Sequence, residues 1–427
     1  MTGENTRDLA LAGIRIIDLT MAWAGPMAVR FLSDLGADAI KIEVAHHMDR
    51  WRGGTFAQRG TERYPNNDPG SEPWNRSSFF NTQNRNKKSL ALNLKTDEGK
   101  EIFRALVAEA DIVAENFSAG AMGRLGLDYP TLQAINPALI MLSMPALGRT
   151  GPESGYIAHG PTIEELAGTT FLQGYAGGPP QASGGFAWGD PIAGMYGAAA
   201  AMAALKQRQV TGEGQHVDLS HLEAGVTFNF DAVLEYTLTG EVTPRLGNRD
   251  RLWAPQGIYP CAGEDRWIAI SVTSDGCWDS LKDAMGTPSW ATDSRYDTES
   301  GRRAHHDEID RNLGAWCSSW EHRELMHHLQ SFGLPAGAVL DAAELAADPH
   351  LDQRDFYVTV THPSTGTHRY PGPPFQMPGT LPARTGPAPR FGEHNEEILG
   401  GLGFNSEEIA AIKQRGVISD LPLPQGD

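Results

Sequence analysis

The first forty or so residues alternate strand, helix and strand at a spacing that restricts the fold more than any other feature of the chain. Residues 13–18 (GIRIID) form a short β-branched run, and Gly25-Pro26 precedes a helical pattern that ends at Gly36. Residues 39–43 (AIKIE) form the next apolar run. Two strands joined by one helix over this distance pair in parallel, because the helix carries the chain back along the sheet. The spacing therefore predicts an α/β fold with a parallel sheet.

The same alternation continues through the first third of the chain. Strands are predicted at 89–94, 111–115 and 139–144, and the helix between the first two has Thr96 as its predicted N-cap. After a Gly- and Pro-rich stretch, an Ala-rich helix is predicted at 192–207. This helix is expected to be buried, because its small residues permit close packing.

The pattern changes at residues 225–330, where one predicted strand lies among several helices. Residues 331–427 then return to strands and helices, with a proline-rich stretch between them. We therefore expect three segments, 1–224, 225–330 and 331–427, of which the middle one is a smaller domain.

The net charge of −18 excludes two classes of partner. Nucleic acids and anionic membranes both require a broad surplus of Lys and Arg. A small polyanionic ligand needs only a local basic cluster and stays compatible with the charge. The N-terminus has no basic region before an apolar stretch, and the three cysteines form no Cys-x-x-Cys pair. We expect a soluble, cytoplasmic protein without a bound metal or a permanently bound cofactor.

The turn after residue 18 lacks the Gly-x-Gly-x-x-Gly fingerprint of dinucleotide binding, and the chain has neither a Walker sequence nor a Gly-x-Ser-x-Gly elbow. It has one compact basic cluster, residues 84–88 (NRNKK), with Arg76 upstream and Arg124 downstream. In an acidic protein such a cluster suits a phosphate group. The alternative is a solvated turn.

Asp190 lies in the sequence GFAWGDPIAGM, directly before the predicted Ala-rich helix. Pro191 is a typical first helical residue, so Asp190 could be the N-cap. The alternative is a carboxylate nucleophile exposed at a helix N-terminus, with glycines that give a substrate close access.

Four long blocks of this sequence resemble the class III CoA-transferases, the CaiB/BaiF family. They begin LAGIRIIDLTMAWAGPMAVRFLSDLGADAIKIE, NRNKKSLALNLKTDEGKEIFRALVAEADIVAENF, GDPIAGMYGAAAAMAALKQRQ and FGEHNEEILGGLGF, and they occur in the family's order. The resemblance implies a Rossmann-like large domain, built from the N-terminal half and the C-terminal segment, with a smaller α+β domain inserted between them. It also implies an interlocked dimer.

The resemblance implies a mechanism as well. An aspartate attacks the thioester of an acyl-CoA donor, forms a mixed anhydride, and is converted by CoA to an aspartyl-CoA thioester from which CoA passes to an acceptor acid. By motif position this aspartate is Asp190. Backbone N–H groups near Gly184-Gly185 and Gly189 are candidates to stabilise the oxyanions.

The resemblance also carries over contacts with coenzyme A, the substrate that the family shares. Arg124 and Lys87 correspond to bases near the CoA phosphates. A further basic residue usual after IKIE is replaced by His46-His47, or its role passes to Arg50. The expected CoA contacts are Trp23, Ala24, Lys87, Asn116, Phe117 and Arg124.

Two alternatives stay open within the family. The first is an α-methylacyl-CoA racemase with His159 and Asp190 as its acid/base pair, but the Asp of the racemase His-Asp pair is Gly160 here. Glu164 and Glu165 are further candidate acids, of which at most one can face a pocket. The second alternative is a CoA-binding subunit of a heteromeric transferase.

The sequence identifies the substrates only as an acyl-CoA and a carboxylic acid. Residues 46–80 supply six aromatic side chains and five arginines that could receive an aromatic or dicarboxylic acid, or could pack against a dimer partner. Arg249 is a second candidate for contact with the acid.

Overall fold

The computed structural model describes residues 9–53, 63–184, 187–377 and 385–423. The chain forms two compact units, which are described separately. The larger unit takes the residues up to 169, 182–234 and those from 353 onward, and the smaller unit takes 170–181 and 235–352.

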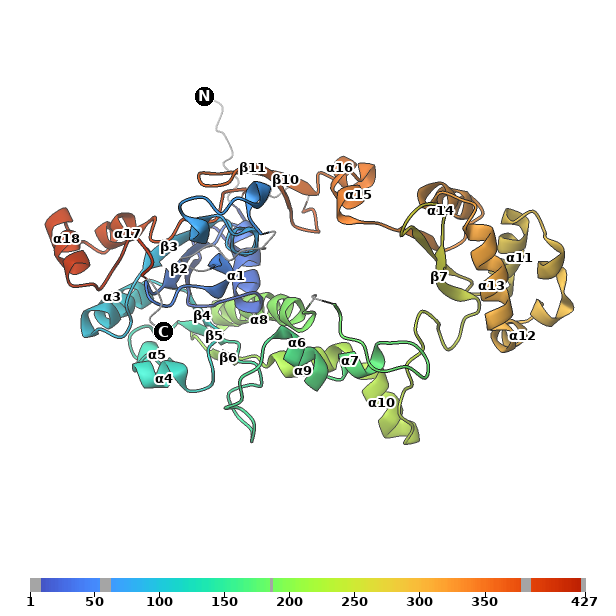
Figure 1. Ribbon diagram of the computed structural model, residues 1–427. Coiled ribbons are helices and arrows are strands. Elements are labelled where there is room, and N and C mark those ends of the chain that lie inside the picture. Colours follow the sequence, from blue (N-terminus) through green and yellow to red (C-terminus); the bar gives the residue numbers. More distant parts are fainter. Residues whose placement is uncertain (1–8, 54–62, 185–186, 378–384, 424–427) are drawn as a thin grey trace, which may run out of the picture. The chain divides into compact units, whose positions relative to one another are not determined.

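A six-stranded parallel sheet forms the centre of the larger unit (Figure 1). Its strand order is β3-β2-β1-β4-β5-β6, and every neighbouring pair is parallel. The strands are β1 (Arg15–Asp18), β2 (Asp38–Glu43), β3 (Lys87–Ala91), β4 (Ile112–Glu115), β5 (Ile140–Ser143) and β6 (His216–Asp218). The α/β fold and the parallel sheet predicted from the sequence are confirmed.

Helices cover both faces of this sheet, which explains why β4 and β5 are buried at every residue. On one face lie α1 (Ala24–Asp34) and α8 (Gly189–Thr211). On the other lie α3 (Asp97–Ala108), α17 (Asn395–Gly401) and α18 (Ser406–Gln414). Neighbouring residues of β1 alternate between these cores, Ile16 in the first and Ile17 in the second.

Helix α8 approaches α1 closely because two of its residues are glycines. A Cβ at Gly194 would lie 2.9 Å from the carbonyl oxygen of Ala24, and one at Gly197 would lie 2.9 Å from the side chain of Met144. A side chain at Gly194 would push the helices apart, and one at Gly197 would displace the side chain of Met144. The two glycines therefore bring the first turn of α8 beside the turn that follows β1.

The larger unit is completed by short elements. These are α2 (Ser78–Gln83), α4 (Ala121–Leu125), α5 (Tyr129–Gln133), α6 (Gly160–Leu166), α9 (His221–Phe228), the antiparallel hairpin of β10 (Tyr357–His362) and β11 (Gly366–Pro371), and the 3₁₀ turns at Arg50–Arg52, Pro65–Asn67 and Pro73–Asn75. Helices α7 (Thr169–Leu172), α10 (Phe230–Thr239) and α16 (Pro349–Gln353) lie across the limits between the units. Within the described residues, no helix is both long and apolar enough to cross a membrane.

The smaller unit has its own antiparallel sheet, ordered β7-β8-β9, and its own apolar core around Trp278. Its strands are β7 (Gln256–Pro260), β8 (Trp267–Ser271) and β9 (Ala336–Val339), and its helices are α11 (Asp275–Ala284), α12 (Glu299–Ala304), α13 (His306–Cys317), α14 (His322–Ser331) and α15 (Ala342–Ala346). It also has 3₁₀ turns at Ser289–Thr292 and Ser294–Tyr296. The unit extends past the expected limit of 330, because β9 pairs with β8.

Candidate active site

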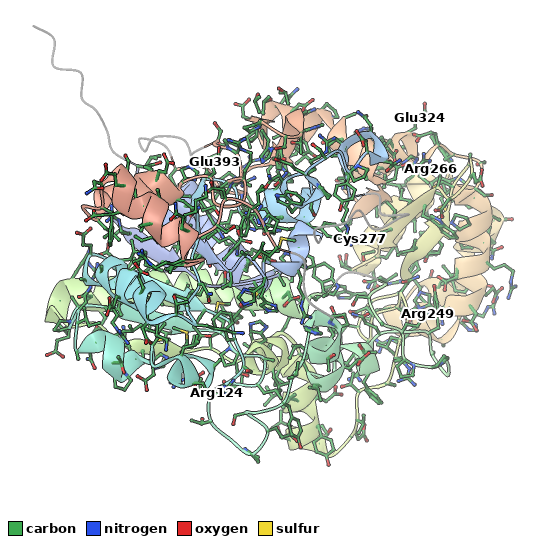
Figure 2. All side chains as sticks on the ribbon, turned by 60° about the vertical axis from the view of Figure 1, so that its left-hand side comes forward. Arg124, Arg249, Arg266, Cys277, Glu324 and Glu393 are labelled. Carbon is green, nitrogen blue, oxygen red and sulfur yellow. The ribbon has the colours of Figure 1, made fainter. Side chains whose placement is uncertain are left out.

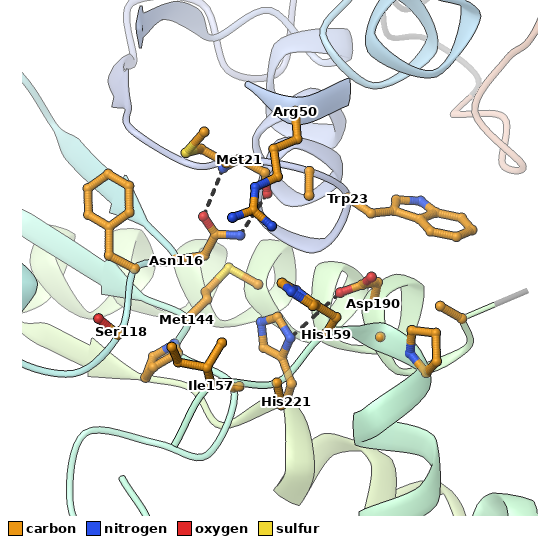
Figure 3. A pocket seen from close by; sticks show the side chains of 18 of the residues that line it. Met21, Trp23, Arg50, Asn116, Ser118, Met144, Ile157, His159, Asp190 and His221 are labelled. Carbon is orange, nitrogen blue, oxygen red and sulfur yellow. Dashed lines mark hydrogen bonds and ion pairs between the residues drawn. The ribbon is translucent and has the colours of Figure 1, made fainter. Parts of the chain in front are cut away.

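A cavity of about 480 Å³ opens at the carboxyl edge of the larger unit's sheet (Figure 3). The segments after β1, β2, β4 and β5 line it, together with the first turns of α6, α8 and α9. Helices after β1 and β4 lie on opposite faces of the sheet, and ligands bind at such a switch point in open α/β sheets. Its lining includes Met21, Trp23, His47, Arg50, Trp51, Asn116, Phe117, Ser118, His159, Gly160, Asp190 and His221.

Asp190 presents its carboxylate to this cavity (Figure 3). The helix α8 begins at Gly189, and its N-cap is Trp188, which makes no side-chain capping bond. Asp190 is therefore the second residue of the helix, and its interpretation as the N-cap is wrong. Its side chain is only 20% exposed. A carboxylate that does not cap its helix and faces a cavity is available for chemistry.

The surroundings of Asp190 disfavour the ionised form of its carboxyl group. Burial, and then the nearby charge of Glu164, raise the pKa of Asp190 to about 6. The carboxylate is consequently ionised at neutral pH but takes up a proton at mildly acidic pH. Such a shift is typical of carboxylates with a chemical role.

Glu164 holds the segment that leads into Asp190. Its buried carboxylate accepts hydrogen bonds from the backbone N–H of Trp188 and from the Oγ of Ser183, the latter at 2.9 Å. Its neighbour Glu165 on α6 is exposed. Glu164 thus both positions the loop before α8 and raises the pKa of Asp190.

Gly160 gives the Asp190 carboxylate its space. A Cβ at Gly160 would lie 2.6 Å from Oδ2 of Asp190 and 2.4 Å from Cβ of Ala187, both too short for non-bonded atoms. The preceding His159 lines the cavity with its side chain near Asp190 (Figure 3). His159 and Asp190 therefore share the cavity, and no residue with a side chain fits at position 160 without moving Asp190.

His221 is a cavity residue that the sequence analysis missed. Its Nδ1 lies 3.8 Å from Oδ1 of Asp190, and burial lowers its pKa to about 4, so the imidazole is neutral at pH 7. Its buried Nε2 has no hydrogen-bond partner among the described residues. The signal available in the sequence was a polar residue three positions after the end of β6, at the carboxyl edge that also holds the other site residues.

Asn116 makes two hydrogen bonds to the backbone of the turn after β1. Its side-chain oxygen accepts from the N–H of Met21 and its side-chain nitrogen donates to the carbonyl of Met21, both at 2.8 Å. Phe117 and Trp23 line the cavity beside it, and the ring of Trp23 lies 5.2 Å from that of Trp51. Ala24 is buried at the start of α1. Of the expected CoA contacts, Trp23, Asn116 and Phe117 thus border the cavity.

Lys87 does not lie where the sequence analysis expected it. Its ammonium donates to Oδ2 of Asp18 (2.8 Å), to the carbonyl of Pro26 (3.0 Å) and to Oδ1 of Asn84 (2.9 Å), and its side chain is fully buried. All three N–H donors are therefore used inside the protein. The expected contact between Lys87 and the CoA phosphates is not compatible with this geometry.

The other charges of the basic cluster 84–88 are also neutralised. Arg85 is buried in a bidentate pair with Asp34, and Lys88 pairs with Asp38 and Glu397. The positive patch expected there is therefore replaced by ion pairs. The charges of Arg85 and Lys87 are thus used in buried ion pairs around β3.

Of the basic residues considered for contact with the CoA phosphates, Arg50 and His47 border the cavity. His47 precedes the 3₁₀ turn Arg50–Arg52, and Arg50 is its first residue. The side chain of Asp49 caps this turn. The Oδ1 of Asp49 accepts from the N–H groups of Ala22 (3.1 Å) and Trp51 (3.0 Å), and its Oδ2 pairs with buried Lys41. Within the described residues Arg50 has no ion-pair partner, and Figure 3 shows its guanidinium over the cavity.

Two expected residues lie elsewhere, and a third is outside the described residues. Arg124 is at the surface of α4, where it makes long hydrogen bonds to Ala119 and Ser118 (Figure 2). Arg249 belongs to the smaller unit and pairs with Asp307 and Asp310, each at 2.6 Å. Gly185, expected among the oxyanion donors, lies outside the described residues.

The chain is similar in sequence to a family of known enzymes. The model of CoA-transferase family III matches residues 11–395. The chain is 32% identical over 409 residues to succinyl-CoA–D-citramalate CoA-transferase of Chloroflexus aurantiacus, covering 96% of this chain and 98% of that protein. It is 30% identical over 425 residues to formyl-CoA:oxalate CoA-transferase of Streptomyces coelicolor, covering 96% and 99%.

A solved structure shows the same fold. A CAIB/BAIF family protein from Brucella suis superposes with a TM-score of 0.82 at 29% sequence identity, over 93% of this chain and 100% of that chain.

Proposed function

Since the chain belongs to CoA-transferase family III, we propose that it moves CoA from an acyl-CoA donor to a carboxylic acid through covalent intermediates on Asp190. The observation that carries this proposal is the Asp190 carboxylate, which does not cap its helix and faces the cavity at the switch point of the sheet. Nucleophilic catalysis by a carboxylate divides CoA exchange between two acids into steps of similar difficulty.

An Asp190 oxygen attacks the donor thioester, CoA leaves as thiolate, and a mixed anhydride forms. The thiolate attacks the aspartyl carbonyl and releases the donor acid, which leaves an aspartyl-CoA thioester. The acceptor carboxylate attacks that thioester and expels CoA, which then attacks the acceptor carbonyl and frees Asp190.

The surroundings of Asp190 suit these steps. Partial removal of water makes the carboxylate more reactive, and its pKa of about 6 keeps it ionised at neutral pH. Neutral His221, 3.8 Å away, offers one N–H for the oxyanions that form at Asp190. The N-terminal end of α8 favours negative charge at the same place.

Replacing Glu164 with glutamine is expected to shift the acid limb of the kcat/KM profile to lower pH. The wild-type limb should have its midpoint near pH 6, because protonated Asp190 cannot attack, and the charge of Glu164 is one cause of that value. Glutamine keeps an acceptor for the Trp188 N–H. The exposed Glu165→Gln is the matched control and should leave the limb in place. If the limb does not shift in Glu164→Gln, the charge of Glu164 is not a cause of the raised pKa of Asp190.

We also propose that the acid acceptor is dicarboxylic. The two relatives described above are named for D-citramalate and oxalate, both dicarboxylic acids. Arg50 can pair with a second carboxylate while the first reacts at Asp190.

Arg50→Gln is expected to raise KM for a dicarboxylic acceptor about tenfold, since a charge-assisted bond is lost, with little change for the monocarboxylic acid of equal length. Steady-state kinetics with the paired acids measures the difference, and Arg50→Lys should recover part of it. An equal effect on both acids would show that Arg50 does not contact the second carboxylate.

One observation favours a racemase as the second candidate function, because His159 and Asp190 line the same cavity. A racemase would exchange the α-proton of an acyl-CoA with solvent and would need no acceptor acid. The racemase His-Asp pattern places an Asp at position 160, where this chain has Gly160. A side chain there would clash with Asp190, so this site differs from that pattern.

We infer further that two chains form the interlocked dimer of the Rossmann-like family, with the smaller unit as an insertion. Apolar side chains stand exposed along α8, α9 and α10, among them Met195, Phe228, Phe230 and Leu238. Light scattering should give the mass of two chains. A monomer would contradict the inference, and activity only with a second protein would indicate the heteromeric form.

A screen of acyl-CoA donors against free acids, read by mass spectrometry, tests the proposed function. The expected result is a new acyl-CoA that appears as the donor is consumed, for at least one dicarboxylic acceptor. No transfer with any pair, together with α-proton exchange, would favour the racemase.

A further inference from the structure

A second cavity, of about 270 Å³, lies in the larger unit between residues 63–82 and the β10–β11 hairpin. It shares no described lining residue with the cavity at Asp190. The proposed transferase chemistry uses none of its residues. Its composition nevertheless points to a ligand.

Apart from two tyrosines, all the titratable side chains in its described lining are basic. These are Arg63, Arg76, His368 and Arg369. No aspartate or glutamate is among its described lining residues, although the chain carries a net charge of −18. A concentration of cations in an acidic protein suits a small anion.

The walls of the cavity are fixed. Arg76 donates to the carbonyl of Ser364 in the hairpin turn and to the carbonyl of Asp68, which ties the two sides together. The guanidinium of Arg63 lies 5.0 Å from the ring of Phe79, and that of Arg369 lies 4.4 Å from the ring of Tyr357. Both arginines are therefore held in place by aromatic faces.

Four buried polar atoms on this lining have no hydrogen-bond partner within the described part of the chain: Nε of Arg63, Oη of Tyr64, Oδ1 of Asn81 and Oγ1 of Thr365. Tyr64 is 5% exposed and Asn81 is 2% exposed, so bulk water reaches neither freely. Buried polar groups are nearly always paired. The Nε of Arg63 donates, the Oδ1 of Asn81 accepts, and the hydroxyls of Tyr64 and Thr365 can do either, which suits a partly protonated oxyanion.

We propose that this cavity binds a phosphate group, with Arg63 and Tyr64 donating to its oxygens, Asn81 accepting from its hydroxyl, and Arg369 supplying charge at the rim. Burial raises the pKa of Tyr64, so its hydroxyl remains a donor at neutral pH. The phosphate could be inorganic or belong to a larger ester, and the volume accommodates either phosphate or the end of such an ester.

Calorimetric titration of the full-length protein with inorganic phosphate, at saturating CoA and constant ionic strength, tests the proposal. One phosphate per chain is expected, with affinity about tenfold lower in Arg63→Gln and clearly lower in Tyr64→Phe, because each loses a donor. Arg303→Gln removes an exposed arginine of the smaller unit and is the control that should bind as the wild type.

A parallel titration with adenosine monophosphate separates the sources, since tighter binding than inorganic phosphate that is still lost in Arg63→Gln would identify an ester as the ligand. Tyr64→Phe retains the ring that packs there, so the test survives if Arg63→Gln does not fold. Absence of phosphate binding at saturating CoA, or wild-type affinity in the variants, would overturn the proposal.

Discussion

Replacing Asp190 with asparagine is expected to lower kcat for CoA transfer by at least about 10⁴-fold, because the amide cannot form the anhydride or the thioester. Affinity for CoA should change little, since the side chain differs by one atom and caps no helix. Steady-state kinetics and CoA titration together measure this. A variant that retains a tenth of wild-type kcat would show that Asp190 is not the nucleophile.

The same variant also tests how ionisation of Asp190 affects the stability of the folded protein at different pH values. The pKa of Asp190 is raised from 3.8 to about 6 in the folded protein, so its contribution to stability is complete below pH 4 and is lost as the pH rises through 6. Asp190→Asn should therefore melt at a higher temperature than the wild type at pH 8, and at a similar temperature near pH 4. A lower melting temperature at pH 8 would instead indicate a structural role for Asp190.

Gly160→Ala is expected to lower kcat by about 10²-fold with little change in the affinity for CoA. The added methyl would lie 2.6 Å from the Asp190 carboxylate, and a displacement of about 1 Å in a reacting group costs this much. The methyl would also press on Ala187 and so on the loop that Glu164 holds. Kinetics and CoA titration separate the effect on chemistry from that on binding.

Gly400→Ala is the matched control, because a Cβ at that helical glycine of α17 meets no atom within 4 Å. It should keep wild-type activity and a melting temperature at least as high. Wild-type kcat in Gly160→Ala would show that the Asp190 carboxylate has another productive position.

The sequence predicted the sheet well because its determinants are local. Apolar runs such as residues 13–18 and 39–43, separated by one helix, have few other ways to bury their side chains. The limit of the smaller unit was less predictable. The pairing of Ala336–Val339 with β8 joins segments far apart in the chain, and no local pattern announces it.

Three residues show the same division between local and long-range determinants. Asp190 was recognisable from its motif, but its position in the first turn of α8, rather than as the N-cap, depends on where that helix begins. Lys87 was misplaced because its partner Asp18 lies on another strand, and a basic run in sequence does not reveal buried acids in space. His221 joins Asp190 only through the packing of α9 against α8 and carried no motif.

Covalent attachment of CoA to Asp190 is tested by peptide mass spectrometry of the protein after incubation with an acyl-CoA donor and rapid acid quench, with borohydride reduction or hydroxylamine treatment as parallel traps. We expect a CoA adduct, or its trapped derivative, on the peptide that contains Asp190, and none in Asp190→Asn. An unmodified peptide, while solvent deuterium enters the α-position of the acyl-CoA, would contradict it.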